Sequence, residues 1–503
     1  MEASRRPHLH PAGPVAALDP GLLSADTHDM DLTLPARAAT TTTDVVLSEV
    51  VAALSHALDL TEGQPRGHAG RTCLIGMRLA RDIGVPEHLE SSLYYALLLK
   101  DAGCSSSAAR MSEIFGGADD IELKRAGKLV DFGNAAEALR FVRDHTGTSG
   151  RGLSRAREVI MTAVRFAQAG GTIVEARCDR GARIVASLGF SAEAAEAVRA
   201  LDEHWDGSGR PDRRSGEEIP LLARIACIAQ TSDVFLTAFG RTAAREMVRD
   251  RSGRWFDPDL ATAFCALGDD DPLWEHVADA ADPSSVAETA PTNDVRVATD
   301  DDLDRIAAAF ADVIDAKSPY TFNHSTGVAR YAVAIAEALA MSPEQVRSLR
   351  RAALLHDIGK LGVPNSILDK PSKLTDDEYA VVKMHPRHTE EILSRVAAFA
   401  PIAFVAGAHH ERIDGRGYHR GLGGDELPPE ARILAVADVF DAMFADRPYR
   451  AGMPVERIMG IMDADAGTAF CPRCVEALHS CLATGLVERR QVDERDQVPG
   501  VTR

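Results

Sequence analysis

The chain repeats itself once, and this repeat constrains its fold more than any other feature. The segment "GHAGRTCLIGMRLARDIGV" from Gly67 is matched by "NHSTGVARYAVAIAEALAM" from Asn323, and "YYALLLKDAG" is matched by "RRAALLHDIG". A third pair follows in the same order, "LDEHWDGSGRP" and "HHERIDGRGYH", with extra residues before it in the first copy. Repeats in a fixed order indicate one structural unit used twice. We therefore expect a tandem duplication.

The apolar pattern of both copies is helical. "DRIAAAFADVIDA" has apolar residues at helical spacing. Two segments begin with the residues of a capping box, Ser342 with Gln345 and Thr375 with Glu378. No alternating apolar and polar run is long enough to require a sheet. The fold class that we expect is all-α, with two tandem helical domains joined by an acidic linker.

Composition shifts divide the chain. Residues 1–44 are rich in Pro, Ala, Thr and His without periodicity, so we expect a disordered segment. Residues 278–299 are small, acidic and proline-containing, which is typical of a linker. Two globular regions remain, residues 45–277 (the first block) and residues 300–486 (the second block), followed by a tail at residues 487–503.

Charge and composition limit the partners. The formal net charge of -19 argues against binding of nucleic-acid polymers or anionic membranes, and an anionic substrate would need local positive charge. We find no apolar stretch near the ~20 residues that span a bilayer and no signal-peptide core at the N-terminus. The 8 cysteines are mostly isolated within apolar runs, which is typical of reduced thiols. We expect a cytoplasmic protein.

Metal-ligating side chains recur at the ends of helical segments in the second block. Neighbouring residues on a helix point about 100° apart, so adjacent pairs such as His356 with Asp357 suit two neighbouring ions better than one. Imidazole and carboxylate ligands together suit Fe, Mn or Zn, and a carboxylate can bridge two cations about 3.5–4 Å apart. The candidate ligands, from five helical segments, are His324, His356, Asp357, His385, His409, His410 and Asp438.

Three cationic residues accompany these ligands. Lys360 lies one helical turn after His356, and Arg447 and Arg450 stand in "ADRPYR". Arginine suits bidentate contact with phosphate. Two metal ions beside these cations would suit phosphoester hydrolysis.

At this point the second block resembles the HD-GYP domain, a bacterial branch of the HD metal-dependent phosphohydrolases. The matching segments are "DAKSPYTFNHS", "LLHDIGKLGVPNSIL", "KLTDDEY", "HPRHTEEIL", "HHERIDGRGY" and "ARILAVADVFDAMFADRPYR". The resemblance implies a phosphodiesterase that hydrolyses cyclic di-GMP to pGpG, GMP or both. It also implies two divalent metal ions as cofactors, Fe(II) or Mn(II).

The resemblance also implies a role for each candidate residue. One metal would be held by His324, His356, Asp357 and Asp438, and Asp357 would bridge to a second metal held by His385, His409 and His410. The implied catalytic residues are His356, Asp357 and Lys360. The implied substrate contacts are Lys360, Tyr418, Asp441, Arg447 and Arg450.

The second block departs from the family pattern at two places. Tyr320 stands where members with a third metal have a glutamate, so we expect a two-metal site. His419 replaces the proline of the signature loop, which restores a backbone N–H there. Since that loop is linked to diguanylate cyclase domains in the family, the partners implied are such domains or a second copy of this chain.

The first block resembles the same domain in degenerate form. His68 and Asp101 match ligands, but Lys100 replaces the histidine before Asp101 and Gln230 replaces the later aspartate. Leu201 and Asp202 stand in place of the paired histidines, and we find no counterpart of His385. We expect a non-catalytic domain in which Lys100 places an ammonium where a cation would sit.

Two other functions stay open at this point. Metal ligands do not select the base, so the substrate could be cyclic GMP-AMP or a noncyclic nucleotide. Alternatively, both blocks could form a regulatory scaffold that binds a cyclic dinucleotide without cleaving it. Turnover assays with a panel of nucleotides separate these alternatives.

Overall fold

The helices predicted from the sequence account for the fold. The computed structural model describes residues 45–146, 152–292, 295–321, 323–446 and 451–485, and within these ranges it contains helices and isolated bridges but no strand. The all-α fold class is therefore confirmed. The N-terminal segment expected to be disordered and the C-terminal tail expected after residue 486 lie outside the described residues.

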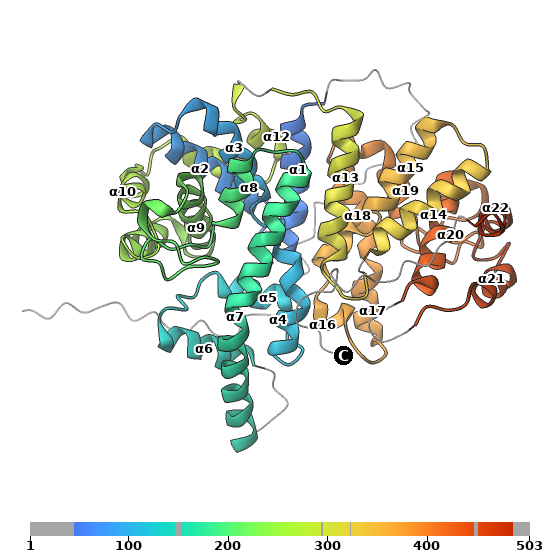
Figure 1. The fold of residues 1–503 in the computed structure, drawn as a ribbon, viewed down its shortest axis with the longest axis horizontal. Coiled ribbons are helices and arrows are strands. Elements are labelled where there is room, and N and C mark those ends of the chain that lie inside the picture. The colour runs from blue at the N-terminus through green and yellow to red at the C-terminus, as the bar shows by residue number, and fades with distance from the viewer. Residues whose placement is uncertain (1–44, 147–151, 293–294, 322, 447–450, 486–503) are drawn as a thin grey trace, which may run out of the picture. The chain divides into compact units, whose positions relative to one another are not determined.

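The first block begins with three helices that bury an apolar core and continues through the region that the second block lacks (Figure 1). Its helices are α1 (Leu47–Thr61), α2 (His68–Ile83), α3 (Glu87–Leu99), η2 (Cys104–Ser107), α4 (Ala108–Ile114), α5 (Asp120–Gly127), α6 (Ala135–His145), α7 (Leu153–Ser187), α8 (Ala192–Arg199), η3 (Gly216–Glu218), α9 (Leu221–Arg251), α10 (Pro258–Ala266), α11 (Leu273–Asp279) and α12 (Pro283–Ala287).

The second block is also built of helices. Its helices are α13 (Asp300–Asp315), α14 (His324–Ala338), α15 (Pro343–Leu355), η5 (Ile358–Gly362), α16 (Asn365–Leu368), α17 (Asp376–Lys383), α18 (His385–Ser394), α19 (Ala400–Gly407), η6 (Gly424–Glu426), α20 (Pro429–Phe444), α21 (Val455–Ala464) and α22 (Pro472–Ala483).

Local sequence signals begin these helices as expected. The side chain of Ser342 accepts the N–H of Gln345 at 3.2 Å, and the Gln345 side chain accepts the N–H of Ser342 at 3.1 Å. Thr375 and Glu378 make the same pair of contacts at the start of α17. Each reciprocal pair satisfies N–H groups that a helix leaves without internal partners. One detail differs, because His385 begins α18 rather than ending the segment before it.

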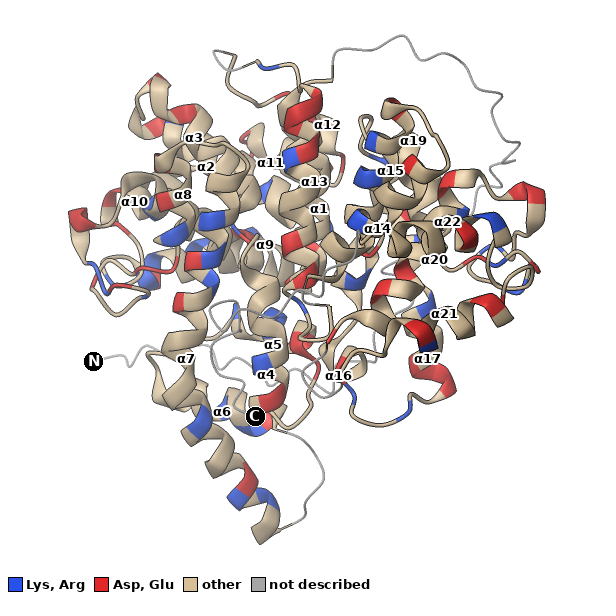
Figure 2. Cartoon of the chain, turned by 45° about the vertical axis from the view of Figure 1, so that its right-hand side comes forward, with Lys and Arg blue, Asp and Glu red and all other residues tan. Residues whose placement is uncertain are grey.

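The two blocks share one hydrophobic core, since their described residues between 45 and 485 belong to one compact unit. Helix α1 packs on α2 and α3 of its own block and also on η5 and α18 of the second block. Figure 2 shows the acidic first turns of α13 and α17. Helix α1 therefore packs against the η5 segment that directly follows His356 and Asp357.

The segment expected to be a linker packs on the first block instead. Ala280 and Val286 are buried, and α12 contacts α1 and α2. The Tyr94 hydroxyl donates to the carbonyl of Val286 at 3.3 Å, and Val297 forms an isolated bridge with Val46. A few apolar side chains in an acidic segment were enough to fix it against a neighbouring apolar surface.

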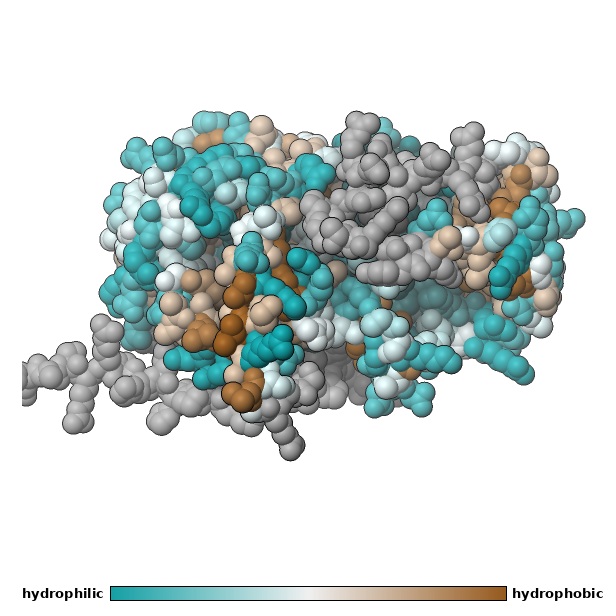
Figure 3. All heavy atoms as spheres, turned by 60° about the horizontal axis from the view of Figure 1, so that its bottom comes forward, coloured by the Kyte–Doolittle hydropathy of each residue, from teal (hydrophilic) through white to brown (hydrophobic). Residues whose placement is uncertain are grey.

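Two long helices distinguish the first block. The 35-residue α7 packs Phe166 against Phe115 and Phe141 in a small separate core, and beyond it exposes Leu153 and Ile160. Figure 3 shows hydrophobic residues gathered on this side of the molecule among hydrophilic ones.

Helix α9 meets the length and composition of a membrane span. The mean hydropathy of its most apolar window is 1.3, and 61% of that window is buried inside the protein. The sequence-based expectation that no apolar segment is long enough to span a bilayer is therefore corrected for α9. Burial in the core accounts for the apolar composition, so the helix is weak evidence for a span.

Candidate metal centre

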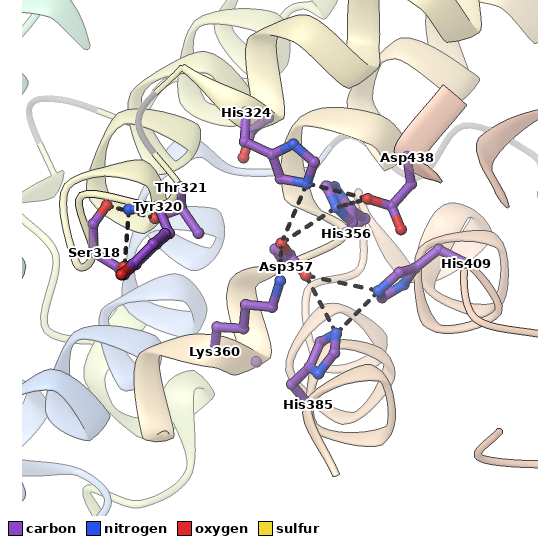
Figure 4. Close-up of polar contacts among 12 residues, drawn as sticks. Ser318, Tyr320, Thr321, His324, His356, Asp357, Lys360, His385, His409 and Asp438 are labelled. Carbon is purple, nitrogen blue, oxygen red and sulfur yellow. Dashed lines mark hydrogen bonds and ion pairs between the residues drawn. The ribbon is translucent and has the colours of Figure 1, made fainter. Parts of the chain in front are cut away.

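The seven predicted ligands converge from five helices, as Figure 4 shows for six of them. His324 is the first residue of α14, and His385 is the first residue of α18. The remaining ligands come from the end of α15, the segment after α19 and the middle of α20. These are His356, Asp357, His409, His410 and Asp438. Helix ends place side chains close together where the helices meet.

Asp357 lies between two groups of imidazoles. Its Oδ2 atom lies 3.4 Å from Nε2 of His356 and 3.9 Å from Nε2 of His324. Its Oδ1 atom lies 3.3 Å from Nε2 of His385 and 3.6 Å from Nε2 of His409. The two oxygens of one carboxylate therefore face different ligand groups, which is the arrangement that a bridging ligand requires.

In four of the histidines, Nδ1 contacts a hydrogen-bond partner that fixes the orientation of the ring. Nδ1 of His356, His385 and His409 donates to a backbone carbonyl three residues earlier, at 2.8, 2.6 and 2.7 Å. Nδ1 of His324 lies 2.7 Å from Oδ2 of Asp441. A ring that donates through Nδ1 turns the Nε2 lone pair towards the centre, as metal-binding histidines do.

The buried carboxylates are held in their charged form. Burial favours the neutral acid at Asp357, yet His356 and Lys360 hold its pKa well below its usual range. Burial acts in the same direction on Asp438, where His324 outweighs it and lowers the pKa. Both side chains are thus anionic at neutral pH, as metal ligation requires.

The imidazoles divide into two groups by the direction in which their surroundings shift the pKa. Burial lowers the pKa of His410 to about 3, and burial with the neighbouring ring of His410 lowers the pKa of His409. Burial also opposes charge on His324, but hydrogen bonds to Asp438 and Asp441 raise its pKa to about 10. The ring of His324 is thus held between two carboxylates that attract a cation.

The donor set fits two divalent cations. Three overlapping groups could each hold an ion: His324 with His356 and Asp438; His356 with Asp357 and His409; and His385 with His409 and His410. Nε2 of His356 and Oδ1 of Asp357 are buried without a hydrogen-bond partner. Buried polar atoms without partners are costly, and mixed imidazole and carboxylate ligands suit Fe, Mn or Zn.

Comparisons with known proteins agree with this geometry. The family model described as "HD domain" matches residues 158–260 and 308–473, one segment in each block. A "3'3'-cGAMP-specific phosphodiesterase 3" from Vibrio cholerae is 43% identical over 441 residues, which covers 87% of this chain and 94% of that protein. The chain belongs to the HD domain family. The resemblance predicted from the sequence is confirmed.

Two further proteins are similar to this HD domain protein. A "Cyclic di-GMP phosphodiesterase response regulator RpfG" from Xanthomonas campestris is 49% identical over 146 residues, which cover 29% of this chain and 39% of that protein. The crystal structure of a cyclic GMP-AMP specific phosphodiesterase from V. cholerae has a TM-score of 0.59 and 37% identity, covering 87% of this chain and 98% of that chain. The second of these relatives extends through both HD blocks.

Of the predicted substrate contacts, Lys360 and Tyr418 lie beside the predicted metal ligands. The Lys360 ammonium lies 2.6 Å from Oδ2 of Asp357 at the partly exposed edge of the centre. The ring of Tyr418 lies against His410, with centroids 4.8 Å apart. Arg447 and Arg450 lie outside the described residues.

The structure describes Asp441 in contact with the first predicted ligand. Its side chain is buried, and its Oδ2 atom accepts from Nδ1 of His324 at 2.7 Å. Asp441 lies one helical turn after Asp438 on α20, so both carboxylates contact the same histidine, Asp438 at Nε2 and Asp441 at Nδ1. Asp441 therefore contacts a predicted metal ligand, and its contact with substrate stays a prediction.

Sequence reasoning missed two supporting residues. Thr389 donates to the carbonyl of His356 at 2.7 Å and accepts the N–H of Gly359 at 3.1 Å, which fixes the segment around Asp357. Glu411 accepts backbone N–H groups of the signature loop, including Leu422 at 3.1 Å. A carboxylate directly after two histidines was a signal for Glu411, whereas Thr389 had only its position one turn after His385.

The corresponding pocket of the first block contains ammonium groups. The ammonium of Lys100 contacts Oδ2 of Asp101, and its role in place of a metal cation stays a prediction. Lys128, which was not predicted, lies 3.3 Å from Oδ1 of Asp101, 2.8 Å from Oε2 of Glu62 and 3.5 Å from Oε1 of Gln230.

These ammoniums decide whether the first pocket can hold a metal. Glu62, Asp101 and Cys104 are close enough together to surround an ion. Both carboxylates already pair with Lys128, and burial raises the pKa of the Cys104 thiol well above its usual value. The first pocket therefore provides its own positive charge.

Proposed function

We propose that the second block hydrolyses a phosphodiester bond of a cyclic dinucleotide at a two-metal centre. The observation that carries this proposal is the position of Asp357, whose two oxygens face different imidazole groups within 3.3–3.9 Å. The relatives support the substrate class, because their names describe cyclic dinucleotide phosphodiesterases. We expect Fe(II) or Mn(II) to occupy the centre.

The residues of the chain have separable tasks in this reaction. Bound cations would supply hydroxide at neutral pH and neutralise charge on the phosphate oxygens. His324, His356, His385 and His409 hold their rings fixed through Nδ1 and need not reorganise during turnover. Lys360, at the open edge, donates to a phosphate oxygen, and the face of Tyr418 stacks on a base.

For the substrate, we propose 3'3'-cyclic GMP-AMP first. The relative specific for that molecule aligns with both blocks, over 94% of its length. Cyclic di-GMP, which the motifs alone favoured, is the second candidate, because the relative named for it is 49% identical within the catalytic region. The products, a cyclase or dimer partner and a cytoplasmic location remain predictions.

The test is turnover by the purified full chain. Protein loaded anaerobically with Fe(II) or Mn(II) is given each cyclic dinucleotide and a noncyclic nucleotide, and products are separated by chromatography. We expect linear products from a cyclic dinucleotide and none after Asp357→Ala. Unchanged turnover in Asp357→Ala would rule out this centre, and tight binding without product under every metal would favour the regulatory scaffold.

A further inference from the structure

One carboxylate of the first block reaches the second block in a fully buried position. Asp120 begins α5, and its side chain has no exposed surface. Its Oδ1 atom accepts the N–H of Asn365 at 2.7 Å, and its Oδ2 atom lies 3.4 Å from Nζ of Lys317. Both partners belong to the second block, so this carboxylate joins the two copies of the repeat.

The two partners of Asp120 stand on the loops that carry metal ligands. Lys317 lies between α13 and α14, in the loop that ends at His324. Asn365 begins α16, which is separated by two residues from the η5 segment that follows Asp357. The side chain of Asn365 also donates to the carbonyl of Lys317 at 2.7 Å. Asp120 therefore joins the loop before His324 to the segment after Asp357.

Short contacts continue from Lys317 to the first ligand. Next to Lys317, the Ser318 hydroxyl donates to Oδ1 of Asp369 at 2.5 Å and accepts the N–H of Tyr320 at 3.1 Å. Thr321 accepts the N–H of His324 at 2.9 Å through its carbonyl. Figure 4 shows Ser318, Tyr320 and Thr321 beside the start of α14. A displacement of this loop would therefore move the first residue of α14.

The carboxylate is fixed from its own side as well. Lys124, one turn further along α5, lies 3.4 Å from Oδ2 of Asp120 and donates to the carbonyl of Thr61 at 3.0 Å. Thr61 precedes Glu62, which pairs with Lys128 in the degenerate pocket. The ion pairs of that pocket thus lie next to Lys124, which contacts Asp120. The first block therefore supports the position of Asp120.

We propose that Asp120 is a positioning residue for the metal centre, supplied by the block that has lost its own metal site. It acts by joining the loop before His324 to the loop after Asp357. The buried ammoniums of Lys317 and Lys124 require its charge, because a buried cation without a partner is unfavourable. The kinetic part of this inference rests on the proposed function, whereas the metal-binding and exchange parts do not.

The test compares Asp120→Asn with Asp131→Asn in the full chain. Asp131 is a matched control, because it is buried in the first block and pairs with Arg254 at 3.0 Å within that block. Calorimetry measures Mn(II) affinity, hydrogen exchange follows residues 316–321 and 358–366, and kinetics give kcat and KM separately. We expect Asp120→Asn to weaken Mn(II) binding about tenfold or more. We also expect faster exchange in both loops and a lower kcat at a similar KM.

The control variant is expected to keep wild-type Mn(II) affinity, loop exchange and kcat, even where its melting temperature falls. If Asp120→Asn does not fold, Lys317→Met tests the same contact from the second block, with the same direction of change expected. Folded Asp120→Asn with wild-type affinity and loop exchange would overturn the inference. Absence of turnover in the wild-type protein would contradict only the proposed function.

Discussion

The two copies of the repeat place the same imidazole in opposite electrostatic surroundings. Nδ1 of His68 lies 2.6 Å from Asp233, and Nδ1 of His324 lies 2.7 Å from Asp441. Burial and the nearby Lys100 lower the pKa of His68 to about 4. Burial also opposes charge on His324, yet Asp438 and Asp441 raise its pKa to about 10.

The opposite pKa shifts of His68 and His324 reflect the source of positive charge in each pocket. In the first block, Lys100 and Lys128 supply it from the chain itself. In the second block, Asp357 and Asp438 face imidazoles with Lys360 only at the edge, so the proposed cations would complete the charge balance. We therefore expect metal chemistry in the second block and none in the first.

The largest effect is expected from removal of the bridge. Asp357→Asn keeps the shape of the side chain but removes its charge, so catalysis should fall by about a thousandfold or more, because both cations lose a shared ligand. Steady-state turnover with metal content measured on the same sample checks this. A variant that binds two metals and turns over normally would break the comparison.

The matching change in the first block should affect stability instead. Asp101→Asn leaves two buried ammoniums without their shared carboxylate, so the free energy of unfolding should fall by about 3–5 kcal/mol. Denaturant unfolding with Mn(II) present measures this change. Loss of metal from the folded variant would show that the first pocket does hold an ion.

A smaller effect is expected from the residue behind His324. Asp441→Asn removes a charged partner of the ring and should weaken metal binding about 10–100-fold. Asp233→Asn is the matched control, because it changes the same contact of His68 in the first block. Calorimetric Mn(II) titration of both variants should show a change only for Asp441→Asn.

The smallest effect concerns pH. The folded pKa of His68, about 4, lies below its ordinary value of 6.5, so the unfolded chain takes up the proton first as pH falls. His68 therefore costs stability below pH 6.5, about 1 kcal/mol at pH 5.5. His68→Gln should flatten the fall in melting temperature between pH 7 and pH 5. Equal pH profiles for variant and wild type would contradict the shift.

Features with a local signal could be predicted from the sequence. The capping boxes at Ser342 and Thr375 depend on residues three positions apart, and they form as expected. The convergence of the ligands could be predicted because adjacent titratable residues at the end of an apolar helix, such as His356 and Asp357, are costly to bury without a cation. The pairing of Asp441 with His324 follows from the same helical spacing, but the motif gave only a substrate role.

The rest could not be predicted because burial is a property of the whole fold. Lys128 and Lys317 look like surface residues in the sequence, yet both lie among buried carboxylates. Asp120 stands in an acidic run with no sign of a distant partner. The acidic segment around Val286 resembled a linker, because two or three apolar residues do not make a pattern.

Metal content per chain tests the central claim most directly. The full-length protein, purified anaerobically and equilibrated with Mn(II), is to be analysed for metal by mass spectrometry and for ion positions by anomalous diffraction. The account predicts two ions per chain, both within reach of Asp357, and none beside Asp101. Ligands that hold no ion, or an ion bound among Lys100, Lys128 and Glu62, would contradict it.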